Sequence, residues 1–257
     1  MWRSWLVGLA VVVALGTGAF GLTRVARSVV FQPPRGHAVP AWPGEEPQLV
    51  TATTEDGLEL QGYYWPATTS NDLLLVFHGN AESQQGMALA AQPLLAGGHG
   101  LLIASYRGYG GNAGKPSEEG LYADGEAWMT VARQAMPPGG QLYLFGHSLG
   151  GAVALEMAER HSVDGVATLG TFTSVTDMAP WFARPFVLDK FDNAKAIAGI
   201  HSPIVLFHGT RDETIPFASA AKLRAASGNR AKVVPIEGGG HNVPMDRVAP
   251  LLWKEFH

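Results

Sequence analysis

A serine between two glycines is the residue with the clearest chemical potential in this sequence. It lies in the pattern G-x-S-x-G at Gly146-His147-Ser148-Leu149-Gly150. The apolar run 142–145 before it is typical of a buried strand, and residues 152–160 after it are rich in helix formers. A strand, a sharp turn and a helix form the context in which this pattern presents a nucleophile. The bare pattern also arises by chance in a glycine-rich chain, so the rest of the sequence must decide.

A serine hydroxyl needs a general base, and the base needs a carboxylate that orients it. After such an elbow serine, the acid precedes the histidine along the chain. Asp212 follows the apolar run 204–207, and His241 follows the run 232–236. We therefore predict Ser148 as nucleophile, His241 as base and Asp212 as orienting acid. The alternative is a purely structural role for both residues, in which His241 caps a turn and Asp212 accepts hydrogen bonds from backbone N–H groups. Other acids and histidines in this half of the chain are less well placed: Asp192, Glu213, His201, His208 and His257.

The oxyanion of an acyl-transfer intermediate needs two hydrogen-bond donors. One predicted donor is the backbone N–H of Leu149, at the start of a helix. The second is the backbone N–H of Asn80, with Ala81 as the alternative, in the loop after the apolar run 73–77. Gly79 lets this loop approach closely, and His78 is interpreted as structural.

Apolar strands and helices alternate along the chain and would position these residues. Unbroken apolar runs favour strands covered on both faces, as in a parallel sheet, and the acidic turn before Gly57 favours an initial antiparallel hairpin. We predict a doubly wound α/β domain, in which ligands bind at the carboxyl ends of the strands. The expected strands are 49–54, 58–65, 73–77, 101–105, 142–145, 163–169, 204–207 and 232–236, and the expected helices are 86–96, 118–135 behind Ser117, 149–160, 217–226 and 247–256.

Several motifs, taken together and in order, resemble the membrane-tethered α/β-hydrolases of the serine-aminopeptidase-like (hydrolase-4-like) group. They are His78-Gly79-Asn80, Tyr106-Arg107-Gly108-Tyr109-Gly110, residues 116–121, the elbow, His208 to Asp212, Gly240-His241 and the segment 27–33. The chain is similar to the branch that includes abhydrolase-domain depalmitoylases and lipases. The resemblance implies an α/β-hydrolase fold with a mostly parallel eight-stranded sheet and helices on both faces. Asn112 stands where the family usually has serine, and Tyr106 and Arg107 are interpreted as structural.

The insert at about residues 173–200 is the segment that could form a cap over the site. It is short, so we expect an open site. Its aromatic residues would form a packed underside or an apolar roof suited to acyl chains. The substrate-pocket candidates are Trp181, Phe182 and Phe186.

Composition limits the classes of function. The chain has 257 residues, of which 46% are hydrophobic and 16% charged, with a formal net charge of −4 and no cysteine. One substantial α/β domain fits this length. The absence of a basic cluster argues against nucleic acid as a partner, and the absence of cysteine excludes a catalytic thiolate, disulfides and cysteine-based metal sites. We predict no metal and no organic cofactor; the oligomeric state stays open.

The N-terminal segment carries no charged residue from Trp5 to Leu22, with Arg3 before it and Arg24 after it. We predict a single-pass membrane anchor over residues 1–23, with the catalytic domain on the extracytoplasmic side. A cleaved signal peptide and a secreted protein are the alternative, since Ala19-Phe20-Gly21 offers small residues for cleavage. A proline-rich connector over 24–47 and the hydrolase domain over 48–257 follow.

The predicted function is that of a serine hydrolase that cleaves carboxylic ester or thioester bonds of apolar acyl substrates through an acyl-enzyme. An amidase or aminopeptidase would use the same three residues, so it stays an alternative. A binding protein that keeps the fold without catalysis is the other alternative; the complete set of three residues argues against it.

Overall fold

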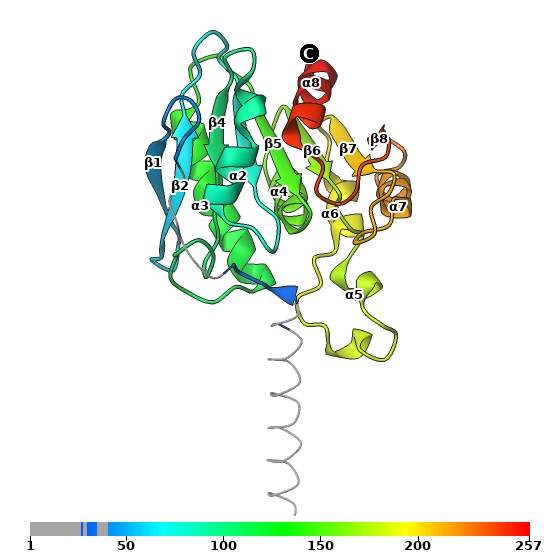
Figure 1. Cartoon of the computed structure of the whole chain (residues 1–257). Coiled ribbons are helices and arrows are strands. Elements are labelled where there is room, and N and C mark those ends of the chain that lie inside the picture. The colour runs from blue at the N-terminus through cyan, green and yellow to red at the C-terminus, as the bar shows by residue number, and fades with distance from the viewer. Residues whose placement is uncertain (1–26, 28–29, 35–40) are drawn as a thin grey trace, which may run out of the picture.

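The computed structural model describes residues 27, 30–34 and 41–257, and Figure 1 shows their arrangement as one α/β domain. Eight strands and their connecting helices alternate along the chain. The strands are β1 (Gln48–Thr53), β2 (Glu59–Trp65), β3 (Leu73–Phe77), β4 (Gly100–Ile103), β5 (Leu142–His147), β6 (Gly165–Leu169), β7 (Ile204–Gly209) and β8 (Lys232–Ile236). The helices are α2 (Gln84–Ala90), α3 (Glu118–Ala135), α4 (Leu149–Arg160), α5 (Val175–Met178), α6 (Asn193–Gly199), α7 (Ala218–Ala226) and α8 (Met245–Phe256), with 3₁₀ turns at η1 (Gln92–Leu95) and η2 (Arg184–Phe186).

All eight strands form one sheet in the order β1-β2-β4-β3-β5-β6-β7-β8. β1 and β2 pair antiparallel, as the turn before Gly57 predicted, and β2 also runs antiparallel to β4. The remaining neighbours are parallel. The predicted α/β-hydrolase fold with a mostly parallel eight-stranded sheet is therefore confirmed, and its parallel strands end at one edge.

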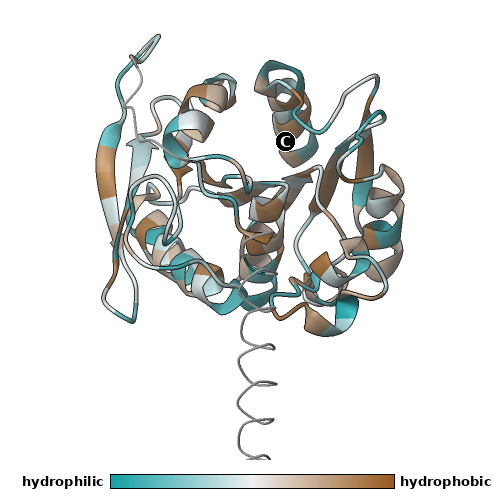
Figure 2. Cartoon of the chain, turned by 60° about the horizontal axis from the view of Figure 1, so that its bottom comes forward, coloured by the Kyte–Doolittle hydropathy of each residue, from teal (hydrophilic) through white to brown (hydrophobic). Residues whose placement is uncertain are grey.

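The sheet is covered on both faces, which explains the unbroken apolar runs. Alternate residues of β3 enter opposite cores: Leu73, Leu75 and Phe77 face the core that α3, α4 and α6 cover, whereas Leu74 and Val76 face the core beneath α2 and α8. Side chains alternate along a strand, so both faces must be apolar when both are covered. In Figure 2 the apolar, brown strands lie between the helices.

Local sequence signals set most helix bounds. Ser117 caps α3, where its Oγ accepts a hydrogen bond from the Gly120 N–H, as expected for a serine N-cap. The single helix predicted over 86–96 was wrong in one respect: the structure has α2 and then the 3₁₀ turn η1. Pro93 explains the break, because proline lacks the N–H that would continue the α-helix.

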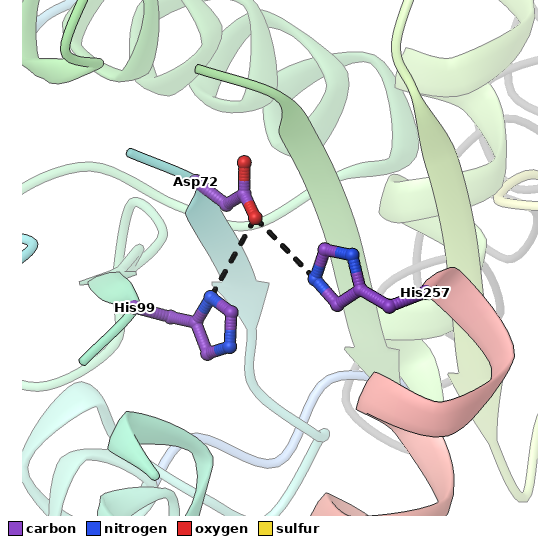
Figure 3. Close-up of side chains that lie close together, drawn as sticks. All are labelled: Asp72, His99 and His257. Carbon is purple, nitrogen blue, oxygen red and sulfur yellow. Dashed lines mark ion pairs between the residues drawn. The ribbon is translucent and has the colours of Figure 1, made fainter. Parts of the chain in front are cut away.

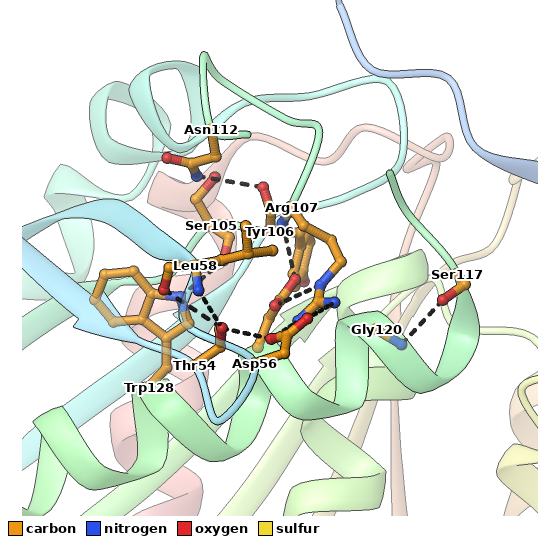
Figure 4. Close-up of polar contacts among 11 residues, drawn as sticks. Thr54, Asp56, Leu58, Ser105, Tyr106, Arg107, Asn112, Ser117, Gly120 and Trp128 are labelled. Atoms are coloured by element: carbon orange, nitrogen blue, oxygen red, sulfur yellow. Dashed lines mark hydrogen bonds and ion pairs between the residues drawn. The ribbon is translucent and has the colours of Figure 1, made fainter. Parts of the chain in front are cut away.

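Arg107 joins three parts of the fold, as Figure 4 shows. Its guanidinium donates to both carboxylate oxygens of Asp56 in the β1–β2 turn, at 2.9 and 3.0 Å, and its Nε donates to Asp124 Oδ1 on α3 at 2.8 Å. Asp124 is fully buried, and burial raises the pKa of its carboxyl to about 6. Asn112 Nδ2 donates to the Tyr106 carbonyl at 3.2 Å in the same loop. These contacts support the structural interpretation of Tyr106 and Arg107.

The predicted membrane anchor, residues 1–23, lies outside the described residues. Within the part of the chain that the structure describes, no helix is both long and apolar enough to cross a bilayer.

Candidate active site

Ser148 occupies the sharp turn between β5 and α4. Its φ of 52° lies in the left-handed region, which is rare for a residue with a side chain, so the surrounding backbone must hold it there. Both glycines of the pattern are required by close approach. A Cβ on Gly146 would overlap the Gly150 carbonyl, and one on Gly150 would overlap the carbonyl of Phe77 on β3. The fold therefore turns the serine out at the carboxyl end of the central strand.

His241 and Asp212 meet Ser148 at this edge of the sheet. His241 Nε2 lies 3.0 Å from Ser148 Oγ, and His241 Nδ1 lies 2.8 Å from Asp212 Oδ2. Asp212 lies in the loop after β7 and His241 in the loop after β8, the second and third strands beyond β5 in the sheet. Both loops reach back to Ser148. The three residues selected from the sequence thus lie within hydrogen-bond distance in the order serine, histidine, aspartate.

The surroundings of Asp212 and His241 suit proton transfer. Asp212 is held by two backbone donors, since its Oδ1 accepts from the N–H groups of Thr214 at 2.9 Å and Ile215 at 2.8 Å. Burial lowers the pKa of the His241 imidazole, although the hydrogen bond to Asp212 opposes this effect. A neutral imidazole is the form that can accept the Ser148 proton.

The other acids and histidines considered from the sequence have different surroundings. Asp192 caps α6 by accepting from the Lys195 N–H. His208 Nε2 lies 2.8 Å from the Ile215 carbonyl and 3.4 Å from Asp212 Oδ2, so it packs behind the acid. Glu213 and His201 are exposed. His257 lies near Asp72, which directly precedes β3 at the opposite edge of the sheet.

The predicted oxyanion donors border the same cavity as Ser148. Leu149 is the first residue of α4, so its N–H has no acceptor within the helix. Asn80 and Ala81 line the cavity from the loop after β3. The Asn80 side chain is engaged three times: its Oδ1 accepts from Tyr109 Oη at 2.7 Å and the Gln32 N–H at 2.9 Å, and its Nδ2 donates to the Val30 carbonyl at 2.7 Å. These bonds hold the loop, while the donor role of the Asn80 N–H stays a prediction.

The segment before the domain reaches the site, which sequence reasoning did not foresee. Arg27 Nε donates to Asp189 of the cap insert at 2.8 Å, and the buried Phe31 ring contacts Phe191 edge to face at 6.0 Å. With the bonds from Asn80 to Val30 and Gln32, this segment joins the cap to the loop after β3. A polar side chain such as Arg27 gives no sequence signal for a contact 162 positions away.

A second set of contacts that the sequence did not predict holds the turn at Ser148 against two neighbouring loops. Glu82 Oε2 accepts from the Gly79 N–H at 2.9 Å and lies 3.5 Å from His147 Nδ1. His147 Nε2 lies 3.3 Å from the His241 carbonyl oxygen. Glu82 and His147 thus connect the loop after β3, the elbow and the His241 loop. The sequence offered one hint of this contact: Glu82 lies three residues after Gly79, a spacing at which its carboxylate can accept from the Gly79 N–H.

Ser148 and His241 open into a cavity of about 910 Å³. Its wall comes from the loop after β3, the elbow, the N-terminal segment and the cap insert. Phe182 and Phe186, two of the substrate-pocket candidates, line it, together with Phe172, Val175, Met178, Val187, Leu188 and Ile215. The third candidate, Trp181, is not among the lining residues and is 81% exposed.

The cap insert carries most of the exposed large apolar side chains of the described chain. Phe191 of the insert is fully buried, whereas α5 and η2 contain no buried residue. The expected packed underside was wrong for its outer stretch, because that stretch has few neighbours to cover it. The exposed residues there are Met178, Trp181, Phe182, Phe186 and Leu188.

Comparison with known proteins assigns the family. Residues 68–195 match the family described as serine aminopeptidase, S33 (Hydrolase_4). The uncharacterized protein MT2364 of Mycobacterium tuberculosis is 33% identical over 251 residues, which cover 93% of this chain and 88% of that protein. The chain belongs to the serine aminopeptidase S33 family. It is therefore a serine hydrolase, and the predicted resemblance to the serine-aminopeptidase-like group is confirmed.

Other relatives and several solved structures resemble this S33 chain over part or most of its length. Alpha/beta hydrolase domain-containing protein 17B of Homo sapiens is 34% identical over 140 residues, which cover 53% of this chain and 48% of that protein. Among solved structures, the Pyrococcus furiosus esterase Pf2001 superposes with a TM-score of 0.68 at 20% identity and covers 87% of this chain and 95% of its own. An acylaminoacyl peptidase of Pyrococcus horikoshii gives a TM-score of 0.63 at 15% identity, covering 82% of this chain and 41% of its own. These structural likenesses concern the fold.

Proposed function

We propose that this serine hydrolase cleaves carboxylic ester or thioester bonds of apolar acyl groups through an acyl-enzyme on Ser148. The observation that carries the proposal is the linked geometry of Ser148, His241 and Asp212 at the floor of an apolar-lined cavity. An acyl chain would lie against Phe182, Phe186 and their neighbours, with its carbonyl carbon above Ser148 Oγ. Burial of apolar substrate surface in such a cavity favours binding.

In acylation, His241 Nε2 accepts the Ser148 Oγ proton as Oγ bonds to the acyl carbon. The carbonyl electron pair moves to its oxygen, and the Leu149 and Asn80 N–H groups are proposed to stabilise that oxyanion. Asp212 keeps the Nδ1 proton in place and stabilises the imidazolium. When the intermediate collapses, His241 donates its proton to the departing alkoxide or thiolate. Water then attacks the acyl-enzyme by the same route, with His241 as base and afterwards as acid.

Cleavage of amides or aminoacyl groups is the second candidate, because the family is described as serine aminopeptidase and the same three residues could act. Binding a free α-ammonium group would require an unengaged carboxylate near the site. The two carboxylates that line the cavity both have partners: Asp189 pairs with Arg27, and Glu82 accepts from the Gly79 N–H. This favours an ester or thioester over an aminoacyl substrate.

The test compares the full chain with its Ser148→Ala variant in detergent, using p-nitrophenyl acetate, a long-chain acyl thioester, an aminoacyl amide and a fluorophosphonate probe. We expect the variant to lose probe labelling and about 10⁴-fold or more in turnover. Ser219→Ala is the control, since this partly exposed serine lies at the start of α7. Retained labelling in Ser148→Ala would disprove the nucleophile, and preferential turnover of the amide would favour the second candidate.

We further infer that residues 1–23 hold the chain at a membrane, with the catalytic domain on the extracytoplasmic side. Two observations on described residues support the membrane contact, whereas the side of the membrane is taken from the sequence. Arg27, close after the uncharged segment, pairs with Asp189 of the cap, and the exposed apolar residues Phe182 and Leu188 line the same cavity as that pair. The mass of the mature N-terminus and fractionation of cells test the inference. Loss of the first twenty or so residues would indicate the secreted alternative instead.

A further inference from the structure

A cluster of two histidines and one aspartate lies at the edge of the sheet opposite Ser148. Asp72 directly precedes β3, His99 directly precedes β4, and His257 follows α8. Because β3 and β4 are parallel, their amino ends lie side by side, and Figure 3 shows the three side chains converging there. The cluster takes no part in the chemistry proposed for Ser148, which lies after the carboxyl end of β5.

The distances within the cluster suit a shared metal ion. Asp72 Oδ2 lies 3.3 Å from His257 Nε2 and 3.7 Å from His99 Nδ1, and all three ligand atoms lie within 4.8 Å of one another. Zinc binds imidazole nitrogen and carboxylate oxygen at about 2.0–2.2 Å, so neighbouring ligands of a tetrahedral ion are about 3.3–3.5 Å apart. Small side-chain shifts would bring the three atoms to these separations.

His99 Nδ1 is an unsatisfied polar atom within the cluster. This nitrogen is buried and has no hydrogen-bond partner, because Asp72 Oδ2 at 3.7 Å is too far away to accept a hydrogen bond. Buried polar atoms are almost always satisfied in folded proteins, and leaving one unsatisfied is costly. A metal ion between Asp72 and His99 would use the Nδ1 lone pair and remove this cost.

The surroundings hold the ligands in place before any ion binds. Asp72 Oδ1 accepts from the Gln141 N–H at 3.1 Å, and its Oδ2 accepts from Ser70 Oγ at 3.1 Å. The His99 ring stacks on Trp253 with centroids 3.6 Å apart, and the His99 and His257 rings are within 14° of parallel. Contacts of this kind orient ligating side chains in metal sites.

In place of the sequence-based prediction of no metal, we propose that Asp72, His99 and His257 bind one divalent transition-metal ion, with Zn²⁺ as the expected ion. Two imidazoles and one carboxylate suit zinc better than Mg²⁺, which prefers oxygen ligands. Three protein ligands leave a fourth position for water. The ion would link the end of α8 to the amino ends of β3 and β4, so its expected role is to stabilise the fold.

The test uses the full chain without a polyhistidine tag, freed of metal by a chelator, then exposed to Zn²⁺ or Mg²⁺ and desalted. We expect about one zinc per chain, no retained magnesium, and a rise in Tm of about 5–10 °C at a zinc concentration about a hundred times Kd. His257→Ala removes a half-exposed ligand and should weaken zinc binding at least about 100-fold. Asp72→Asn gives a second variant that keeps the side-chain volume.

Two matched variants serve as controls. His201→Ala removes an exposed histidine outside the cluster, and Ser148→Ala removes the proposed nucleophile; both should bind zinc as the unaltered chain does. Failure of the unaltered chain to retain zinc would overturn the proposal. Equal zinc binding by the unaltered chain, His257→Ala and Asp72→Asn would also overturn it.

Discussion

Ser148 has a strained backbone and lies within hydrogen-bond distance of a partly buried histidine, His241. The left-handed φ of Ser148 is tolerated because the Gly146 and Gly150 positions admit no side chain and because the Ser148 N–H donates to the Leu169 carbonyl at 2.9 Å. This backbone conformation places Oγ 3.0 Å from Nε2 of His241, the proposed base. At this scale, most of the preparation for catalysis lies in backbone geometry.

The pH dependence of kcat/KM should report on His241. Burial lowers the pKa of this imidazole below its ordinary value of 6.5, and the neutral form is the active base, so kcat/KM should rise with pH through a midpoint below 6.5. The His147 ring, 5.2 Å away, also lowers the pKa of His241. His147→Gln should therefore move the midpoint upward. Rates on p-nitrophenyl acetate between pH 4.5 and 8 check this, and a midpoint above 6.5 in the unaltered chain would contradict it.

At the scale of elements, the cap insert divides into a side that faces the cavity and a side that faces outward. Phe182 and Phe186 line the cavity, whereas Trp181 does not, although Trp181 and Phe182 are adjacent in the chain and their rings are 5.9 Å apart. The N-terminal segment holds this insert through the Arg27–Asp189 pair. Substrate selection should therefore depend on Phe182 and Phe186 and not on Trp181.

Substitutions in the cap separate the two sides. Phe182→Ala should lower kcat/KM for a long-chain acyl ester about 10-fold, because it removes apolar surface from the cavity, and should change turnover of p-nitrophenyl acetate less. Trp181→Ala should leave both substrates in detergent within about twofold. Steady-state kinetics on an acetate and a long-chain ester measure both effects. Equal losses on the two esters in Phe182→Ala would argue against an acyl-binding role.

At the scale of the whole molecule, Arg107 connects the β1–β2 turn, the loop after β4 and α3. Asp124 depends on this connection, because its carboxylate is fully buried and accepts from both the backbone N–H and the Nε of Arg107 at 2.8 Å. Asp56, Arg107 and Asp124 do not line the cavity at Ser148, so disruption of their contacts should act on stability more than on chemistry.

Arg107→Ala should lower the free energy of unfolding by about 3–5 kcal/mol at pH 7, because it leaves a buried carboxylate without its cation. Arg107→Lys should lose less, since it keeps the charge but not the paired geometry. Burial raises the pKa of Asp124 to about 6 even though Arg107 lowers it, so without Arg107 this pKa should lie higher still, and protonation of Asp124 should make the loss in Arg107→Ala smaller at pH 5 than at pH 7. Denaturant unfolding at pH 5 and 7 measures this; a loss independent of pH would contradict the role of Asp124.

Much of the fold followed from the order of local patterns along the chain. Strand β8 and helices α3 and α4 have the bounds that residue type predicted, because apolar runs and the Ser117 cap act within a few residues. The residues Ser148, Asp212 and His241 were selected by the same logic, since each follows an apolar strand that ends at one edge of a parallel sheet.

What only the tertiary structure decided were contacts between distant segments. These contacts are the bonds from the Asn80 side chain to the backbone of Val30 and Gln32, the Arg27–Asp189 pair, and the convergence of Asp72, His99 and His257. They leave no periodic signal, because each joins polar groups far apart in the chain. The outward position of Trp181 was also decided only by the tertiary structure, since aromatic composition does not say which way a loop residue points. The sequence by itself selected the residues for the chemistry proposed at Ser148, whereas side-chain packing between distant loops decided the shape of the cavity above it.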